Sequence, residues 1–158
     1  MKKYELTEET VKVSEITLYR IRAVRDFGSV KAGDLGGYIE KEENLSHCGE
    51  AWVSDNAMVC GYAEVCGYAE VSGKACVCGD AEVSDTRHFF VQGPIGSRDD
   101  FVTFYRTKDD TVGVKCGCFS GSLQEFVNQV EKTHGGSRYE KEYKLAVELA
   151  KVCIHLEG

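Results

Sequence analysis

The sequence lacks any long run of apolar residues. No segment approaches the ~18 consecutive apolar residues that a membrane-spanning helix needs, and residues 1–14 mix Lys, Glu and Thr where a secretory signal would have an apolar core. Both absences favour a cytoplasmic chain that does not associate with a membrane. A cytoplasmic location in turn implies that the eight cysteines stay reduced instead of forming a disulfide framework.

Positive charge is scarce in one segment of the chain. Residues 47–86 carry one Lys or Arg against seven Asp or Glu, whereas residues 1–46 carry eight against nine and residues 87–158 carry ten against ten. The net charge of −7 therefore comes almost entirely from the middle of the chain. Because an acidic surface repels phosphate backbones and attracts basic proteins, this segment is not expected to bind nucleic acid directly.

The acidic segment repeats every six residues. Each unit has a β-branched residue suited to a short strand, a Gly or Asp that tolerates unusual backbone angles, and a small Ala for a crowded corner. From Val53 the units read VSDNAM, VCGYAE, VCGYAE, VSGKAC, VCGDAE and VSDTRH. Over residues 51–86 the pattern resembles the hexapeptide repeat of left-handed parallel β-helices. We therefore expect three units to close one coil.

Residues eighteen apart should then lie one above another at the ~4.8 Å spacing of neighbouring strands. Ile39 and Leu45 fall in step with the Ala column, so the coil is expected to begin in degenerate form before Ala51. Because so short a coil cannot bury its own ends, the flanking segments should cap it. The expected stacks are Cys60 over Cys78, Met58 over Cys76, Glu64 over Glu82, and Glu70 beside Trp52 and His88.

The flanking segments have other periodicities. Residues 15–30 alternate as a strand does, and strands are expected over residues 87–93, 100–107 and 111–119. A helix is expected from Ser122, whose spacing to Glu125 forms a capping box, and a second from about Arg138. The predicted fold is mostly β with an α+β cap: a short left-handed parallel β-helix, then a β-hairpin with two helices. The predicted divisions are an N-terminal strand and capping segment (1–46), the β-helix (47–86) and an α/β cap domain (87–158).

A wider resemblance covers residues 15–153. The stretches LYRIRAVRDFGSVKAGDLGGYIEKEENLS and GPIGSRDDFVTFYRTKD, with the repeats between them, resemble small hexapeptide-repeat proteins encoded by bacteriophages and prophages. The resemblance implies the architecture above and a host bacterial cell. Phage accessory proteins of this size often antagonise host defence systems, so it also implies a role of that kind, for example as an inhibitor of a CRISPR effector.

Hexapeptide-repeat folds are also known from acyltransferases, in which a histidine at a subunit junction acts as general base. His47 and His88 lie at the two ends of the repeats, but the sequence shows no orienting partner for either and no inserted loop that would build an acceptor pocket. We therefore predict no catalytic residue and no enzymatic activity. A degenerate acyltransferase remains an alternative.

The paired cysteines do not predict a metal site. Zinc ligands are usually separated by two to four residues, whereas Cys76–Cys78 and Cys116–Cys118 enclose one residue each. We predict neither a metal nor a cofactor. Cys60 and Cys78, stacked on adjacent coils, have the separation that a disulfide requires if they are oxidised.

The remaining candidate for function is a surface. Carboxylates and tyrosines at regular spacing suit the basic groove of a host protein, and short coils with exposed edges favour a homodimer or homotrimer. A second alternative, sequestration of a nucleotide signal, would need a basic pocket built from Arg20, Arg22, Arg25, Arg98 or Arg106. The predicted partner-binding residues are Asp55, Tyr62, Glu64, Tyr68, Glu70, Asp80, Glu82 and Asp85.

Overall fold

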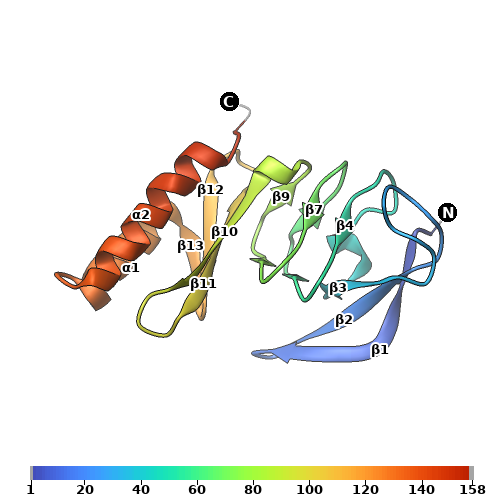
Figure 1. The fold of residues 1–158 in the computed structure, drawn as a ribbon, viewed down its shortest axis with the longest axis horizontal. Coiled ribbons are helices and arrows are strands. Elements are labelled where there is room, and N and C mark those ends of the chain that lie inside the picture. The colour runs from blue at the N-terminus through green and yellow to red at the C-terminus, as the bar shows by residue number, and fades with distance from the viewer. Residues whose placement is uncertain (1, 157–158) are drawn as a thin grey trace.

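The computed structural model describes residues 2–156 as a series of layers along one axis (Figure 1). Short parallel strands occupy the middle, a hairpin of β1 (Tyr4–Val13) and β2 (Ile16–Ala23) extends from one end along one side of them, and an antiparallel sheet with two helices lies at the other end. No helix in the described part of the chain is long and apolar enough to cross a membrane.

The short strands pair in parallel in three rows. The pairs Met58–Cys76, Trp52–Glu70 and Glu64–Glu82 each join residues eighteen apart, which confirms the predicted stacking. We name the rows the first face (β3, Leu35–Ile39; β5, Met58–Val59; β8, Cys76–Val77), the second face (β6, Glu64–Val65; β9, Glu82–Val83) and the third face (β4, Trp52–Val53; β7, Glu70–Val71).

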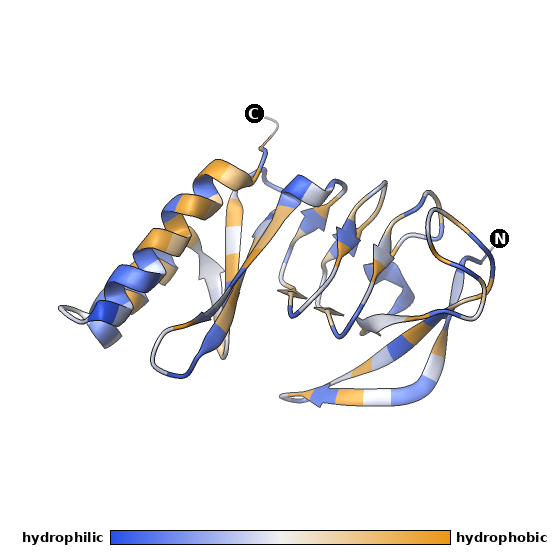
Figure 2. Ribbon diagram, in the orientation of Figure 1, coloured by the Kyte–Doolittle hydropathy of each residue, from blue (hydrophilic) through white to orange (hydrophobic). Residues whose placement is uncertain are grey.

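The two apolar columns of the repeat make the core of the coil. Its valines and alanines are at most 1% exposed and belong to one packed cluster. At the corners, Gly61, Gly67, Gly73 and Gly79 all have φ near +66° and Asp55 has φ +54°, as the sequence predicts for that column, whereas its last member, Asp85, is extended at φ −149°. Figure 2 shows the resulting alternation of apolar and polar residues along the coil.

The first coil departs from the predicted register. Ile39 pairs with Val59 and Leu45 forms a bridge with Val65, so both lie in the Val column and not in the Ala column. The prediction was wrong because the loop at 46–50 adds two residues to the first coil, which changes the offset from eighteen to twenty. His88, the other predicted neighbour of Glu70, belongs to the short helix η2 (Thr86–His88) instead of a strand.

Side chains from the flanks cover both ends of the coil. Tyr4 and Phe27 pack edge-on against Trp52 at the N-terminal end, with ring centroids 6.4 and 5.2 Å away. Tyr105, from the antiparallel sheet, joins the same cluster at the other end. The short coil is therefore buried at both ends, as a repeat structure requires.

The C-terminal layer holds more strands than the sequence predicts. β10 (Phe89–Ile95), β11 (Asp100–Arg106), β12 (Val112–Cys116) and β13 (Phe119–Ser122) form one antiparallel sheet. The single strand expected over 111–119 is divided because Gly117 turns the chain at φ +56°. The polar strand β1 was not predicted at all.

Both predicted helices are confirmed. Helix α1 (Leu123–His134) begins with the Ser122–Glu125 capping box, and α2 is Arg138–Cys153. Together they cover one side of the four-stranded sheet, where Phe104, Phe126 and Tyr143 are part of a second core.

Lys3 is buried in the N-terminal cap, where its Nζ donates to the carbonyl oxygen of Ala51 at 2.6 Å. Burial and the nearby Arg25 lower the pKa of Lys3 to about 8. Between pH 8 and about 10.4 the unfolded state therefore binds more protons than the folded state, and the Lys3 contribution to stability rises with pH.

We expect Lys3→Met to abolish this rise, because methionine has no proton to release. Urea unfolding of wild type and Lys3→Met at pH 7.5 and 9.5 measures it as the change in unfolding free energy between the two pH values. The exposed Lys2 is the control, and Lys2→Met should retain the wild-type rise. An identical pH response in wild type and Lys3→Met would contradict the assignment.

Candidate binding face

A groove of about 520 Å³ runs along the second face of the coil. One wall is the loop around helix η1 (Glu42–Asn44) and the other is the segment from Gly61 to Cys66, with Lys108 at one edge. Asn44 holds the loop against the coil, since its Nδ2 donates to the carbonyl oxygens of Gly61 and Ala63. The volume lies in the range of small-molecule and peptide sites.

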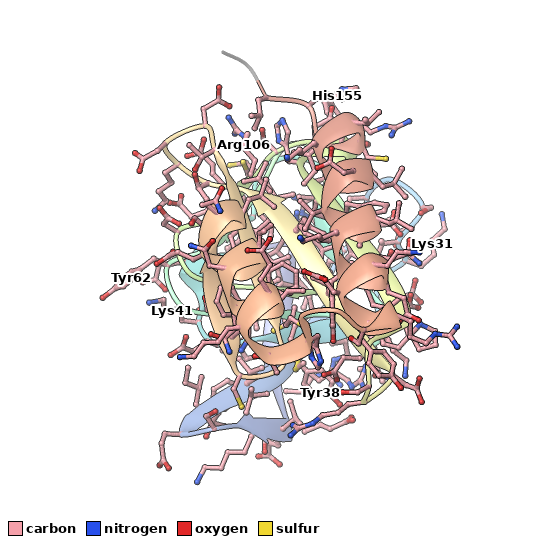
Figure 3. The ribbon with its side chains drawn as sticks, turned by 90° about the vertical axis from the view of Figure 1, so that its left-hand side faces the viewer. Lys31, Tyr38, Lys41, Tyr62, Arg106 and His155 are labelled. Carbon is pink, nitrogen blue, oxygen red and sulfur yellow. The ribbon has the colours of Figure 1, made fainter. Side chains whose placement is uncertain are left out.

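Two tyrosines project from the corners of the coil. The side chains of Tyr62 and Tyr68 are 75% and 78% exposed, and each follows a glycine that turns the chain. Lys41 lies with its Nζ 4.9 Å from the centre of the Tyr62 ring, and both side chains project from the same side of the molecule (Figure 3). Because the Tyr62 amide donates to the carbonyl oxygen of Gly79 in the next coil, the corner that carries this ring is fixed.

The eight predicted partner-binding residues do not share one face. The second face carries Glu64 and Glu82, and Glu70 lies on the third face opposite Trp52. Two others hold corners: the carboxylate of Asp55 accepts from the Gly73 amide, and that of Asp85 accepts from the Arg87 amide. Tyr62 and Asp80 adjoin the second face, and Tyr68 adjoins the third.

The stacked glutamates of the second face have cationic partners from the C-terminal layer. Glu82 Oε1 lies 3.0 Å from Arg106, whose side chain is 5% exposed and whose Nη1 is also 3.7 Å from Asp110. Glu64 lies 2.6 Å from Nζ of Lys108. The Glu64–Glu82 repulsion is thus offset by charges 24 or more residues away in sequence, which the repeat pattern alone cannot reveal.

His47 lies in the groove and has an orienting partner that the sequence did not reveal. Its Nδ1 accepts from the Lys3 amide at 3.0 Å, so the ring proton lies on Nε2, which is 2.9 Å from Glu42 Oε1. Tyr4 stacks on the ring at a centroid distance of 4.1 Å. The hydrogen bond to His47 also lowers the pKa of Glu42. His88, the other candidate, is buried and accepts from the Ser84 amide.

Four of the five arginines considered for a nucleotide pocket are engaged by other groups of this chain, and the fifth, Arg98, lies apart from them in the loop after β10. Arg20 pairs with Glu9 and also donates to Tyr38, and Arg22 pairs with Glu5, all around the N-terminal hairpin. Arg25 donates to the carbonyl oxygen of His47, and Arg106 is bound to Glu82. Within residues 2–156, no three His, Cys, Asp or Glu side chains are placed to hold a metal ion.

Comparison with known proteins gives one partial similarity. No protein-family model matches the chain. A stretch of 70 residues is 37% identical to the protein named Uncharacterized acetyltransferase YdcK of Escherichia coli strain K12, and it covers 39% of this chain and 22% of that protein. The chain thus spans about a fifth of the length of this relative.

Proposed function

We propose that the protein is a non-enzymatic binding module of phage type, in which a left-handed parallel β-helix presents tyrosines and carboxylates to a basic groove of a host protein. The partner would be a component of a nucleic-acid-binding defence system, such as a CRISPR effector. The observation that carries the proposal is the exposure of Tyr62 and Tyr68 on backbone corners that the coil holds in place.

Exposed tyrosines on a rigid backbone suit protein recognition. A tyrosine ring supplies a large contact area with few rotatable bonds, so little conformational entropy is lost when it is covered. The carboxylates of Glu70, Asp80 and Asp85 belong to the same coils as the two tyrosines and form no salt bridge within residues 2–156, whereas Glu64 and Glu82 would have to exchange Lys108 and Arg106 for cations of the partner. The first group is therefore expected to contribute most to binding a basic groove.

The test compares capture of host proteins by wild type, by Tyr62→Ala/Tyr68→Ala and by Leu145→Ala. Leu145 is a matched control because it is 64% exposed on α2, away from the coil. We expect wild type and Leu145→Ala to capture the same basic partner, to compete with its nucleic acid, and to release it as salt increases. The double tyrosine variant should bind at least about tenfold more weakly, as expected when two interface tyrosines are lost.

Equal binding by all three proteins, or a partner whose nucleic acid remains bound, would contradict this proposal. The predicted homodimer or homotrimer is measured in the same samples by light scattering, since two copies would present two sets of tyrosines to the partner.

Acetyl transfer is a second candidate, favoured by the similarity to YdcK and by the His47–Glu42 pair in the groove. A carboxylate that orients an imidazole is a common arrangement for a general base. In the present geometry, however, both ring nitrogens are engaged, so His47 must release the Lys3 amide before its Nδ1 can accept a proton. Turnover of acetyl-coenzyme A that is lost in His47→Gln would replace the binding proposal with this one.

A further inference from the structure

Cys60 and Cys78 lie side by side in the wall of the first face. They follow β5 and β8, and the amide of Cys60 donates to the carbonyl oxygen of Val77 at 3.0 Å, which places the two cysteines opposite each other on neighbouring coils. The spacing of ~4.8 Å between neighbouring strands lies within the Cα separations of disulfides, about 4.4–6.8 Å. All eight cysteines are free thiols in this structure.

The surroundings of the two sulfur atoms differ. Hydrogen bonding from Cys60, supported by Ser120 and by the positive charge of Lys115, lowers the pKa of Cys78 to about 6 despite its burial. Hydrogen bonds with Cys76 and then Cys78, together with burial, raise the pKa of Cys60. Cys78 Sγ lies 3.9 Å from Ser120 Oγ. The pair thus combines a thiol of lowered pKa with an adjacent thiol of raised pKa, and a thiol of lowered pKa is the more reactive of the two toward an oxidant.

Access to this pair is limited to small molecules. Cys60 and Cys78 are 7% and 6% exposed and pack with Leu18 and Met58, whereas Cys76, two residues before Cys78, is half-buried. A bulky thiol or alkylating reagent is therefore hindered, while hydrogen peroxide is about as small as two water molecules. Cys48 and Cys118 are exposed to every reagent.

We propose that Cys60 and Cys78 are a dithiol that hydrogen peroxide oxidises to a disulfide joining two coils. The Cys78 thiolate attacks one peroxide oxygen, the O–O bond breaks, and hydroxide leaves to take up a proton as Cys78 becomes a sulfenic acid. The Cys60 sulfur then attacks the Cys78 sulfur, the S–O bond breaks, and a second water leaves with the Cys60 proton. Two thiols lose two electrons in total, and the peroxide is reduced to two waters.

The disulfide would link two neighbouring coils covalently. It closes a loop of eighteen residues between adjacent coils, which restricts the unfolded chain and slows local opening of the first face. This inference does not depend on the proposed function, since it concerns the wall of the coil and not the exposed tyrosines.

Peptide mapping of the full-length protein tests the proposal directly. Lys74 separates the two cysteines, so trypsin leaves Cys60 in a peptide ending at residue 74 and Cys78 in residues 75–87. After hydrogen peroxide we expect these peptides to be joined through Cys60 and Cys78, and the melting temperature to rise by about 5 °C or more, reversibly with dithiothreitol.

Serine variants make the assignment specific, because Ser54, Ser72 and Ser84 occupy the same column and serine is therefore compatible with the coil. Cys60→Ser and Cys78→Ser should abolish both the link and the rise in melting temperature, whereas Cys76→Ser and Cys48→Ser should keep them. Oxidation confined to Cys48 and Cys118, or a link that persists in Cys60→Ser, would overturn the proposal.

Discussion

Replacing Val65 by Asp is expected to prevent folding altogether. Val65 is 1% exposed and lies between Leu45 of the coil before and Val83 of the coil after. The substitution removes about 1.5–3 kcal/mol of apolar burial and places a carboxylate where no cation is present, which costs several kcal/mol more. The sum is comparable with the ~5–15 kcal/mol that stabilises a typical domain.

Circular dichroism during heating measures this effect as the loss of a cooperative unfolding transition. The matched control is Tyr62→Asp, which introduces the same charge three residues earlier at a side chain that is already exposed. The control should melt close to wild type. A Val65→Asp protein that melts within a few degrees of wild type would show that the Val column is not a continuous core.

Replacing Arg106 by Ala is expected to lower the unfolding free energy by about 2–3 kcal/mol, or the melting temperature by about 5–10 °C. The guanidinium is buried between Glu82 and Asp110 and also donates to the carbonyl oxygen of Glu82. Its loss leaves Glu82 beside Glu64 with one less compensating charge and removes the packing of the side chain.

A second substitution distinguishes charge from packing. In Arg106→Ala/Glu82→Gln, part of the lost stability should return because the neutral side chain at position 82 no longer places an unpaired carboxylate beside Glu64. Lys108→Ala is the matched control, because Lys108 is the cation paired with the other stacked glutamate, Glu64. It should change stability much less because Lys108 is exposed. Equal effects of Arg106→Ala and Lys108→Ala would mean that the buried ion pair does not join the two layers.

The repeat could be predicted from sequence because each hexad follows local steric rules. A glycine at the corner with positive φ, an alanine where space is limited and a valine in the wall together specify the coil, whichever residues lie far away. The capping box at Ser122 is local in the same way. By contrast, the first coil was misaligned because its loop is two residues longer and leaves no hexad signal.

The candidate site was harder to predict because its contacts join distant segments. The partners of Glu64 and Glu82 come from the end of β11 and the loop after it, and the residue that orients His47 lies on η1. Both depend on how the flanking layers fold over the coil. Strand β1 was not predicted because its residues are mostly polar and show no clear apolar alternation. It lies at the edge of its sheet.

The stacking of residues eighteen apart is the claim on which the fold and the candidate site both depend, and engineered cross-links measure it directly. The starting variant keeps Cys66 and has serine in place of every other cysteine. A second cysteine is then introduced at position 84 in one variant and at position 72 in another. Cys66 lies beside Ser84 on the next coil, where its amide donates to the Val83 carbonyl oxygen at 2.9 Å, whereas Ser72 follows β7 on the third face. We expect Ser84→Cys to form an intramolecular disulfide with Cys66 and Ser72→Cys to form none. A cross-link from Ser72→Cys and not from Ser84→Cys would contradict the stacked coil.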